Sequence, residues 1–155
     1  MKYLKIQQDL LKAVEARDQK HKPFSYWWFE MDESIFICPG GHYIVRIPCV
    51  FWYLDKDKIF NMPPINGKSF IKNFYDLDEA TDTHITQDVI ADDNKKKLHM
   101  FTVGDESVLL DEVNLKYFDL ADSQFRGTNR RNPIYIYEDE TLVGMVLPVN
   151  HNEVS

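Results

Sequence analysis

The fold is decided by Phe29–Ile35 (FEMDESI), a stretch in which an acidic two-residue turn, Asp32-Glu33, separates two apolar runs. A similar stretch, Tyr137–Leu142 (YEDETL), stands near the other end of the chain. Each is followed by an apolar run with a proline, at Ile47–Val50 (IPCV) and Leu147–Val149 (LPV). Polar turns between short runs of aromatic and β-branched residues predict antiparallel strands.

The segments that precede these hairpins are also alike. Tyr3–Lys12 (YLKIQQDLLK) lines up with Val108–Tyr117 (VLLDEVNLKY), since each is a short apolar run followed by a helical pattern. Both parts of the chain are therefore predicted to open as a strand and a helix. An internal repeat restricts the fold more than composition does. The sequence predicts an α+β fold with a duplicated strand-helix-three-strand unit, in which two helices pack on antiparallel sheets.

The period of the apolar residues predicts the two helices. Leu10, Leu11 and Val14 share one side of a helix over residues 7–20, and a second helix is expected over residues 114–125. The remaining apolar runs are short and bounded by turn residues, which favours strands. The strands are expected at residues 25–31, 34–38, 42–50, 85–90, 98–103, 133–137 and 142–147.

The length and composition of the chain predict one domain. The 155 residues divide into a first half at about 1–54, an insertion at about 55–83 and a second half at about 84–150. The insertion is rich in proline and acidic residues, and a short helix is expected around residues 68–76. A hydrophobic content of 44% is enough for a packed core.

The sequence lacks the residue patterns typical of metal binding and of general-base catalysis. The two cysteines, Cys38 and Cys49, form no metal-ligand motif, and Asp88, Asp92 and Asp93 lack the spacing of a calcium loop. His42 in its glycine turn has no recognisable acid or nucleophile beside it, so a turn role is favoured over general-base catalysis. We expect a non-enzymatic protein without cofactor or metal. It is also expected to be cytoplasmic and not membrane-bound, because no run reaches the ~20 apolar residues of a membrane span.

One stretch resembles a known family. Trp28–Pro48 (WFEMDESIFICPGGHYIVRIP) is similar to the middle domain of the bacterial DNA polymerase III beta sliding clamp, with Gly41-His42 matching the middle of a characteristic turn. The family has Asp at Gly40 and Arg at Tyr43. Ser107–Phe118 resembles the strand and second helix of a clamp domain, and Asn132–Ile134 resembles the start of its closing strands. The resemblance omits residues 51–100.

The resemblance implies a function and partners. Clamp rings of this family encircle duplex DNA with helices facing inward, so a single-domain chain would need about six copies to close a ring. The expected function is that of a DNA-clamp-like processivity or scaffolding factor of a phage or mobile element. Duplex DNA, a polymerase or other replication protein, and further copies of this chain are the partners that it implies. The alternative is a clamp-shaped interaction or structural module without DNA binding.

Basic residues near the predicted helices are the candidate DNA ligands, because phosphate neutralisation dominates nonspecific affinity. They are Arg126, Arg130, Arg131, Lys12, Arg17, Lys20 and Lys116. The net charge of −7 and the nearly neutral outer faces of both predicted helices favour the alternative module. Solvated basic residues near helix C-termini are the simpler interpretation of these clusters. The aromatic runs Trp27–Phe29 and Phe51–Tyr53 could form a stacking surface for single-stranded nucleic acid. Alternation within strands buries about half of them, so a core role is favoured, with one or two residues left for an interface.

Overall fold

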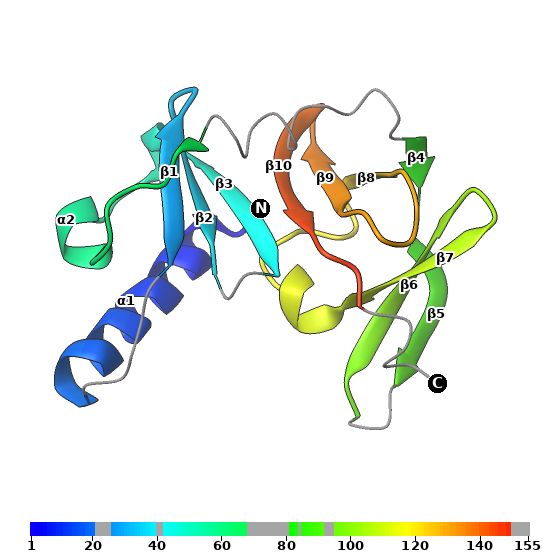
Figure 1. Ribbon diagram of the computed structural model, residues 1–155, viewed down its shortest axis with the longest axis horizontal. Coiled ribbons are helices and arrows are strands. Elements are labelled where there is room, and N and C mark those ends of the chain that lie inside the picture. Colours follow the sequence, from blue (N-terminus) through cyan, green and yellow to red (C-terminus); the bar gives the residue numbers. More distant parts are fainter. Residues whose placement is uncertain (21–25, 40–41, 68–80, 84, 92–94, 150–155) are drawn as a thin grey trace.

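The computed structural model describes residues 1–20, 26–39, 42–67, 81–83, 85–91 and 95–149, and it has a mixed α+β fold (Figure 1). The coarse fold class predicted from the sequence is therefore confirmed. The helices are α1 (Tyr3–Lys20), α2 (Lys56–Ile59) and the 3-10 turns η1 (Cys49–Phe51) and η2 (Glu112–Leu115). The strands are β1 (Trp27–Met31), β2 (Ser34–Cys38), β3 (Tyr43–Pro48), β4 (Thr81–Thr83), β5 (Ile85–Ala91), β6 (Lys97–Val103), β7 (Glu106–Asp111), β8 (Gln124–Gly127), β9 (Ile134–Glu138) and β10 (Thr141–Val146).

The strands form two antiparallel sheets. The larger has the order β1-β2-β3-β10-β9-β8-β4, and the smaller has the order β5-β6-β7. The two meanders β1-β2-β3 and β8-β9-β10 meet at their last strands, where Val45 aligns with Gly144 and Tyr43 with Val146. The strands predicted in these meanders and in the β5-β6 hairpin are confirmed, with shifted ends. The short strand β8 was not predicted, and its first residues fall in a predicted helix.

Both acidic turns close tight hairpins. Asp32 and Glu33 have φ of 53° and 55°, and Asp139 and Glu140 have φ of 47° and 64°. Two consecutive residues in this conformation make the turn whose twist matches antiparallel strands. The first turn joins the first two strands of its meander, whereas the second joins the last two. The acidic stretches that align in the sequence therefore occupy different places, and the duplication is not confirmed.

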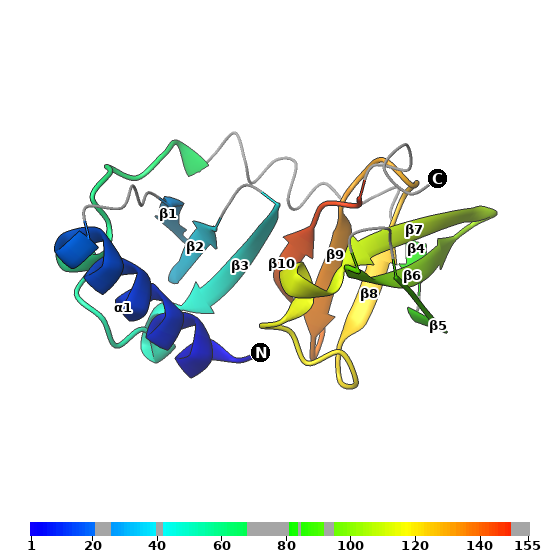
Figure 2. The same cartoon turned by 90° about the horizontal axis from the view of Figure 1, so that it is seen from below.

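Helix α1 packs along one face of the larger sheet (Figure 2). Ile6, Leu10 and Val14 are buried there in one core with Ile35, Val45 and other residues of β2 and β3. This confirms the helix over residues 7–20. The strand expected at the start of Tyr3–Lys12 is wrong, because the helical spacing of buried side chains extends back to Ile6 and the helix begins at Tyr3.

The second predicted helix, residues 114–125, is also wrong. Only η2 forms, and β8 begins at Gln124. The segment between them forms separate turns, in which the Phe118 amide donates to the Leu115 carbonyl and the Asp122 amide donates to the Asp119 carbonyl. The Ser123 hydroxyl also donates to the Asp119 carbonyl, at 2.5 Å. Phe125 then turns into the core, where its ring packs edge-on against Phe101.

The predicted insertion begins with α2 and then covers an edge of the sheet. Ile65 donates its amide to the Trp28 carbonyl at 2.9 Å, and the Trp28 indole donates to the Met62 carbonyl at 2.8 Å. These contacts protect the edge strand β1 from pairing with another chain. The helix expected around residues 68–76 lies outside the described residues.

The junction between the meanders requires a glycine. A Cβ atom on Gly144 would lie 2.5 Å from the Phe118 ring and 2.6 Å from the Ile44 carbonyl oxygen. Phe118 and Ile44 are both buried, so neither can move aside without disturbing the core. The β3–β10 pairing therefore depends on the absence of a side chain at this position.

Replacing Gly144 by alanine should lower the free energy of unfolding by about 1–3 kcal/mol, because the core must shift to admit one methyl group. Urea unfolding followed by circular dichroism measures this change. Gly104→Asn is the matched control, since Gly104 has φ of 58° and open space around it and asparagine tolerates that conformation. Equal stability of Gly144→Ala and the wild type would contradict the proposed constraint.

Candidate functional site

The two groups of basic residues that follow the predicted helices do not converge in the structure. Arg126 lies on β8, and Arg130 and Arg131 lie in the exposed connection to β9. Arg17 and Lys20 are in the last turn of α1, which lies on the opposite side of the molecule from β8 in both views (Figures 1 and 2). The two basic groups therefore form no common face.

Several of these basic side chains already have partners. Arg17 donates to the carbonyls of Lys58 and Ile59 at 3.3 Å and so ties α1 to α2. The Arg126 guanidinium lies 4.7 Å from the centre of the Tyr137 ring. Lys116 lies 4.9 Å from the centre of the Tyr117 ring. These contacts favour structural roles, whereas Lys12 and Lys20 are exposed on α1.

A group of exposed apolar side chains adjoins the start of α1. We call Leu4, Val50, Phe51 and Tyr53 the apolar platform, and their exposed fractions are 63%, 78%, 44% and 66%. Trp52 between them turns inward and stacks on Phe60, with ring centres 5.9 Å apart. The core role favoured for this aromatic run is therefore wrong for Phe51 and Tyr53, while Trp52 is partly buried against the core.

A buried glutamine holds the apolar platform in place. The Gln7 side-chain amide donates to the Phe51 carbonyl at 2.9 Å and to the Tyr3 carbonyl at 3.1 Å. Its oxygen accepts the Tyr53 amide at 2.7 Å. The Phe51 ring also stacks on Tyr3 with ring centres 5.2 Å apart. A loop that carries exposed apolar side chains is therefore fixed to the helix at its backbone.

Gln7 is not among the residues predicted from the sequence, although its spacing contains a signal for it. Gln7 precedes Leu10 by three residues and Val14 by seven, which places it on the apolar side of α1. A polar residue on that side must satisfy its hydrogen bonds inside the protein. Leu11, which was predicted with the core residues, is instead 44% exposed.

A groove of about 540 Å³, called here the lysine groove, runs beside the apolar platform. Leu4, Gln8, Phe51 and Tyr53 contribute to its walls, and the charged side chains in its lining are Lys2 and Lys5. Lys5 pairs with Asp9 at 3.2 Å. The groove therefore carries two lysines in a chain whose net charge is −7, and Asp9 offsets the charge of one of them in part.

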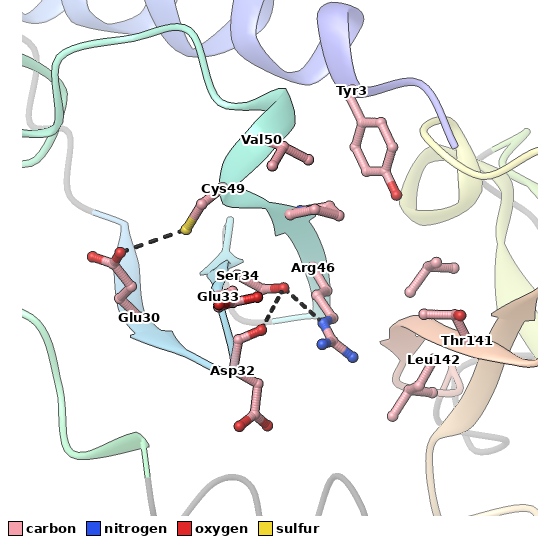
Figure 3. Close-up of a pocket in the computed structure, with 12 residues that line it drawn as sticks. Tyr3, Glu30, Asp32, Glu33, Ser34, Arg46, Cys49, Val50, Thr141 and Leu142 are labelled. Atoms are coloured by element: carbon pink, nitrogen blue, oxygen red, sulfur yellow. Dashed lines mark hydrogen bonds between the residues drawn. The ribbon is translucent and has the colours of Figure 1, made fainter.

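A second cavity lies where β3 and β10 separate (Figure 3). It has a volume of about 610 Å³ and is lined by residues from the end of β3, the start of β10, the β1–β2 turn and α1. Burial raises the pKa of the Tyr3 hydroxyl at its wall, and the Glu138 carboxylate raises it further. At another wall a hydrogen bond from Lys56 lowers the pKa of Glu30. Tyr3 therefore stays a hydrogen-bond donor at neutral pH.

No family model, curated protein or solved structure matches the chain.

Within the described ranges, no cluster of three or more His, Cys, Asp or Glu side chains is placed to hold a metal ion. None of the helices there has the length and apolar character needed to cross a membrane. His42 is exposed immediately before β3.

Replacing Gln7 by leucine should lower the free energy of unfolding by about 1–3 kcal/mol, because the Phe51 carbonyl and Tyr53 amide lose their partner. Faster hydrogen exchange at the Tyr53 amide should accompany this loss. Gln8→Leu makes the same chemical change at an exposed position of α1 and should leave both quantities near wild type. If the Tyr53 amide exchanged equally slowly in both variants, Gln7 would not be what holds the apolar platform.

Proposed function

We propose that this chain is a non-enzymatic protein-interaction module that binds an acidic and apolar segment of a partner protein on the apolar platform. The observation that carries this proposal is the combination of exposure and rigidity at Phe51 and Tyr53. Both rings face solvent, yet the backbone beneath them is held by Gln7. Neighbouring apolar side chains exposed on a fixed surface are typical of protein-binding sites.

Rigidity favours binding at this surface. Burying apolar area contributes roughly 25 cal/mol per Å², but association must also offset the entropy lost when side chains and loops become ordered. The hydrogen bonds of Gln7 and the stacking of Phe51 on Tyr3 have already ordered this loop in the free protein. Less of the binding free energy is then spent on ordering it.

Charge selects the partner. Lys2 and Lys5 are the charged residues that line the groove beside the apolar platform. An acidic segment is attracted to these lysines, and a basic one is repelled. The partner we propose therefore combines Asp or Glu with large apolar side chains.

The finer description of the fold as clamp-like is also a proposal. It is supported by the two three-stranded meanders that meet at β3 and β10. It is weakened by η2, which stands where a clamp domain has its second helix, and by the different places of the two acidic turns. A clamp-like architecture is compatible with an interaction module and does not require DNA binding.

Selection from a random peptide display library against the folded protein should enrich sequences that combine acidic and large apolar residues. Val50→Asp places a negative charge on the apolar platform. It should lower the affinity of the selected peptides, measured by fluorescence anisotropy, by about tenfold or more. Val113→Asp is the matched control, because Val113 is equally apolar, 61% exposed and outside the platform.

Two results would contradict the proposed surface. One is enrichment of no peptide above background, and the other is equal affinity of the selected peptides for Val50→Asp and the wild type. Light scattering over a range of protein concentrations gives the mass in solution. A dimer that Val50→Asp dissociates would identify a second copy of the chain as the occupant, and the partner proposed above would then be wrong.

The same protein should bind duplex DNA weakly and without the steep salt dependence of a clamp that contacts many phosphates. The physical reason is the dispersal of the basic residues on an acidic chain. Anisotropy of labelled duplex DNA between low and moderate salt measures this dependence. Tight binding that falls steeply with salt, and that the combined Arg126→Ala, Arg130→Ala and Arg131→Ala variant reduces, would instead support the DNA-associated function.

A further inference from the structure

We propose that the cavity between β3 and β10, called here the fork cleft, binds a carboxylate group carried on an apolar body, with Arg46 as its ligand. This site goes beyond the apolar platform. Its chemistry rests on the placement of one arginine at the point where two paired strands separate.

The strand register creates the fork cleft. The pairing of β3 with β10 covers residues 43–45 of β3 and residues 144–146 of β10. An irregularity between Leu142 and Gly144 shifts the register of β10 against β9 at the same place. The residues just beyond the pairing, Arg46 and Pro48 on β3 and Thr141 to Val143 on β10, line the cleft.

Arg46 is held by one side of its guanidinium. Its Nε donates to the Ser34 hydroxyl at 3.0 Å, and Ser34, which is buried, in turn donates to the Asp32 carbonyl at 3.3 Å. The guanidinium carbon lies 5.6 Å from the centre of the Phe36 ring. These contacts fix the side chain and leave the two terminal nitrogens without a hydrogen bond or ion pair in the part of the chain that the structure describes.

The open end of this guanidinium suits a carboxylate. Arginine presents a planar pair of N–H donors that matches the two oxygens of a carboxylate. The Tyr3 and Thr141 side chains line the same cleft and supply hydroxyl groups (Figure 3). Val50, Leu142 and Val143 supply an apolar wall. The site therefore fits an acid group on an apolar body.

The carboxylates around the fork cleft disfavour a ligand with more than one negative charge. Glu30 is already paired with Lys56 at 2.6 Å, and Glu138 is paired with the amino group of Met1. Asp32 and Glu33 are exposed at the cleft's rim, where solvent screens their charge. One arginine facing these groups balances a monoanion better than a phosphate dianion.

Two sources can supply this carboxylate. One is a free small organic acid, and the other is an acidic side chain of the partner segment on the apolar platform. The second source rests on the proposed function, and the geometry allows it because Val50 belongs to the platform and also lines the fork cleft. Tyr3 likewise lines both the fork cleft and the lysine groove.

The first test titrates the folded protein with phenylacetate and, as a matched neutral probe, with phenylacetamide. Nitrogen-proton NMR spectra should show saturable shifts at the Arg46 Nε–H and at the Thr141 and Leu142 amides with phenylacetate alone. Arg46→Gln should weaken phenylacetate binding by about tenfold or more, because it removes the charge-assisted hydrogen bonds. Arg131→Gln removes an exposed arginine elsewhere and should change nothing.

Several outcomes would overturn the proposal. Equal shifts with phenylacetamide would reduce the fork cleft to an apolar cavity, and tighter binding of inorganic phosphate would make it a different anion site. Unchanged phenylacetate binding by Arg46→Gln would remove Arg46 from the site. If that variant fails to fold, Arg46→Lys keeps the charge without the planar fork and should still bind phenylacetate more weakly than the wild type; equal affinity would contradict the proposal.

A second arm separates the two sources of the carboxylate. Weaker binding of the display-selected peptides to Arg46→Gln would assign the carboxylate to the partner segment. Undiminished peptide binding together with a phenylacetate response would assign it to a free acid. Peptide binding without any phenylacetate response, and without an effect of Arg46→Gln, would contradict the proposed site in the fork cleft. It would leave the function proposed for the apolar platform unaffected.

Discussion

The pairing of β3 with β10 is the interaction on which the rest of the structure depends. It joins segments about a hundred positions apart in the chain and turns two three-stranded meanders into one sheet. Closing so long a loop costs conformational entropy, which the core must offset. The close contact of Gly144 with Phe118 fixes where the pairing occurs, and the end of the pairing after Val45 opens the fork cleft.

Helix α1 is the second tie between the two parts of the chain. Its apolar residues pack on β2 and β3, while Asp9 accepts a hydrogen bond from the Tyr117 hydroxyl at 2.7 Å. Burial raises the pKa of Tyr117, so this donor keeps its proton throughout the neutral range. Tyr3 and Gln7 both belong to α1. Residues of this one helix therefore contribute to the lysine groove, the apolar platform and the fork cleft.

Local patterns predicted the hairpins well, and the long-range features of the site could not be predicted in the same way. Asp32-Glu33 and Asp139-Glu140 identified their turns because the chemistry of a two-residue turn is local. The helix expected from Asn114 does not form, because Phe125 belongs to β8, where it pairs with Ile136 and packs against Phe101 in the core. The stripe of apolar residues in the sequence does not reveal these distant partners. Arg46 carried no sequence signal, since its importance arises only where β10 separates from β3.

The two proposed surfaces contribute different kinds of recognition. The apolar platform offers area, which binds without strong directional preference. The proposed arginine site of the fork cleft offers direction, since its terminal N–H groups donate to the two oxygens of a carboxylate in one orientation. Apolar area alone distinguishes poorly between partners of similar size, whereas a half-buried guanidinium left unpaired in a complex carries a desolvation cost. A partner that fills both surfaces avoids that cost. In the proposed arrangement, the separation of β3 from β10 adds a directional contact to the apolar platform and to the lysines beside it.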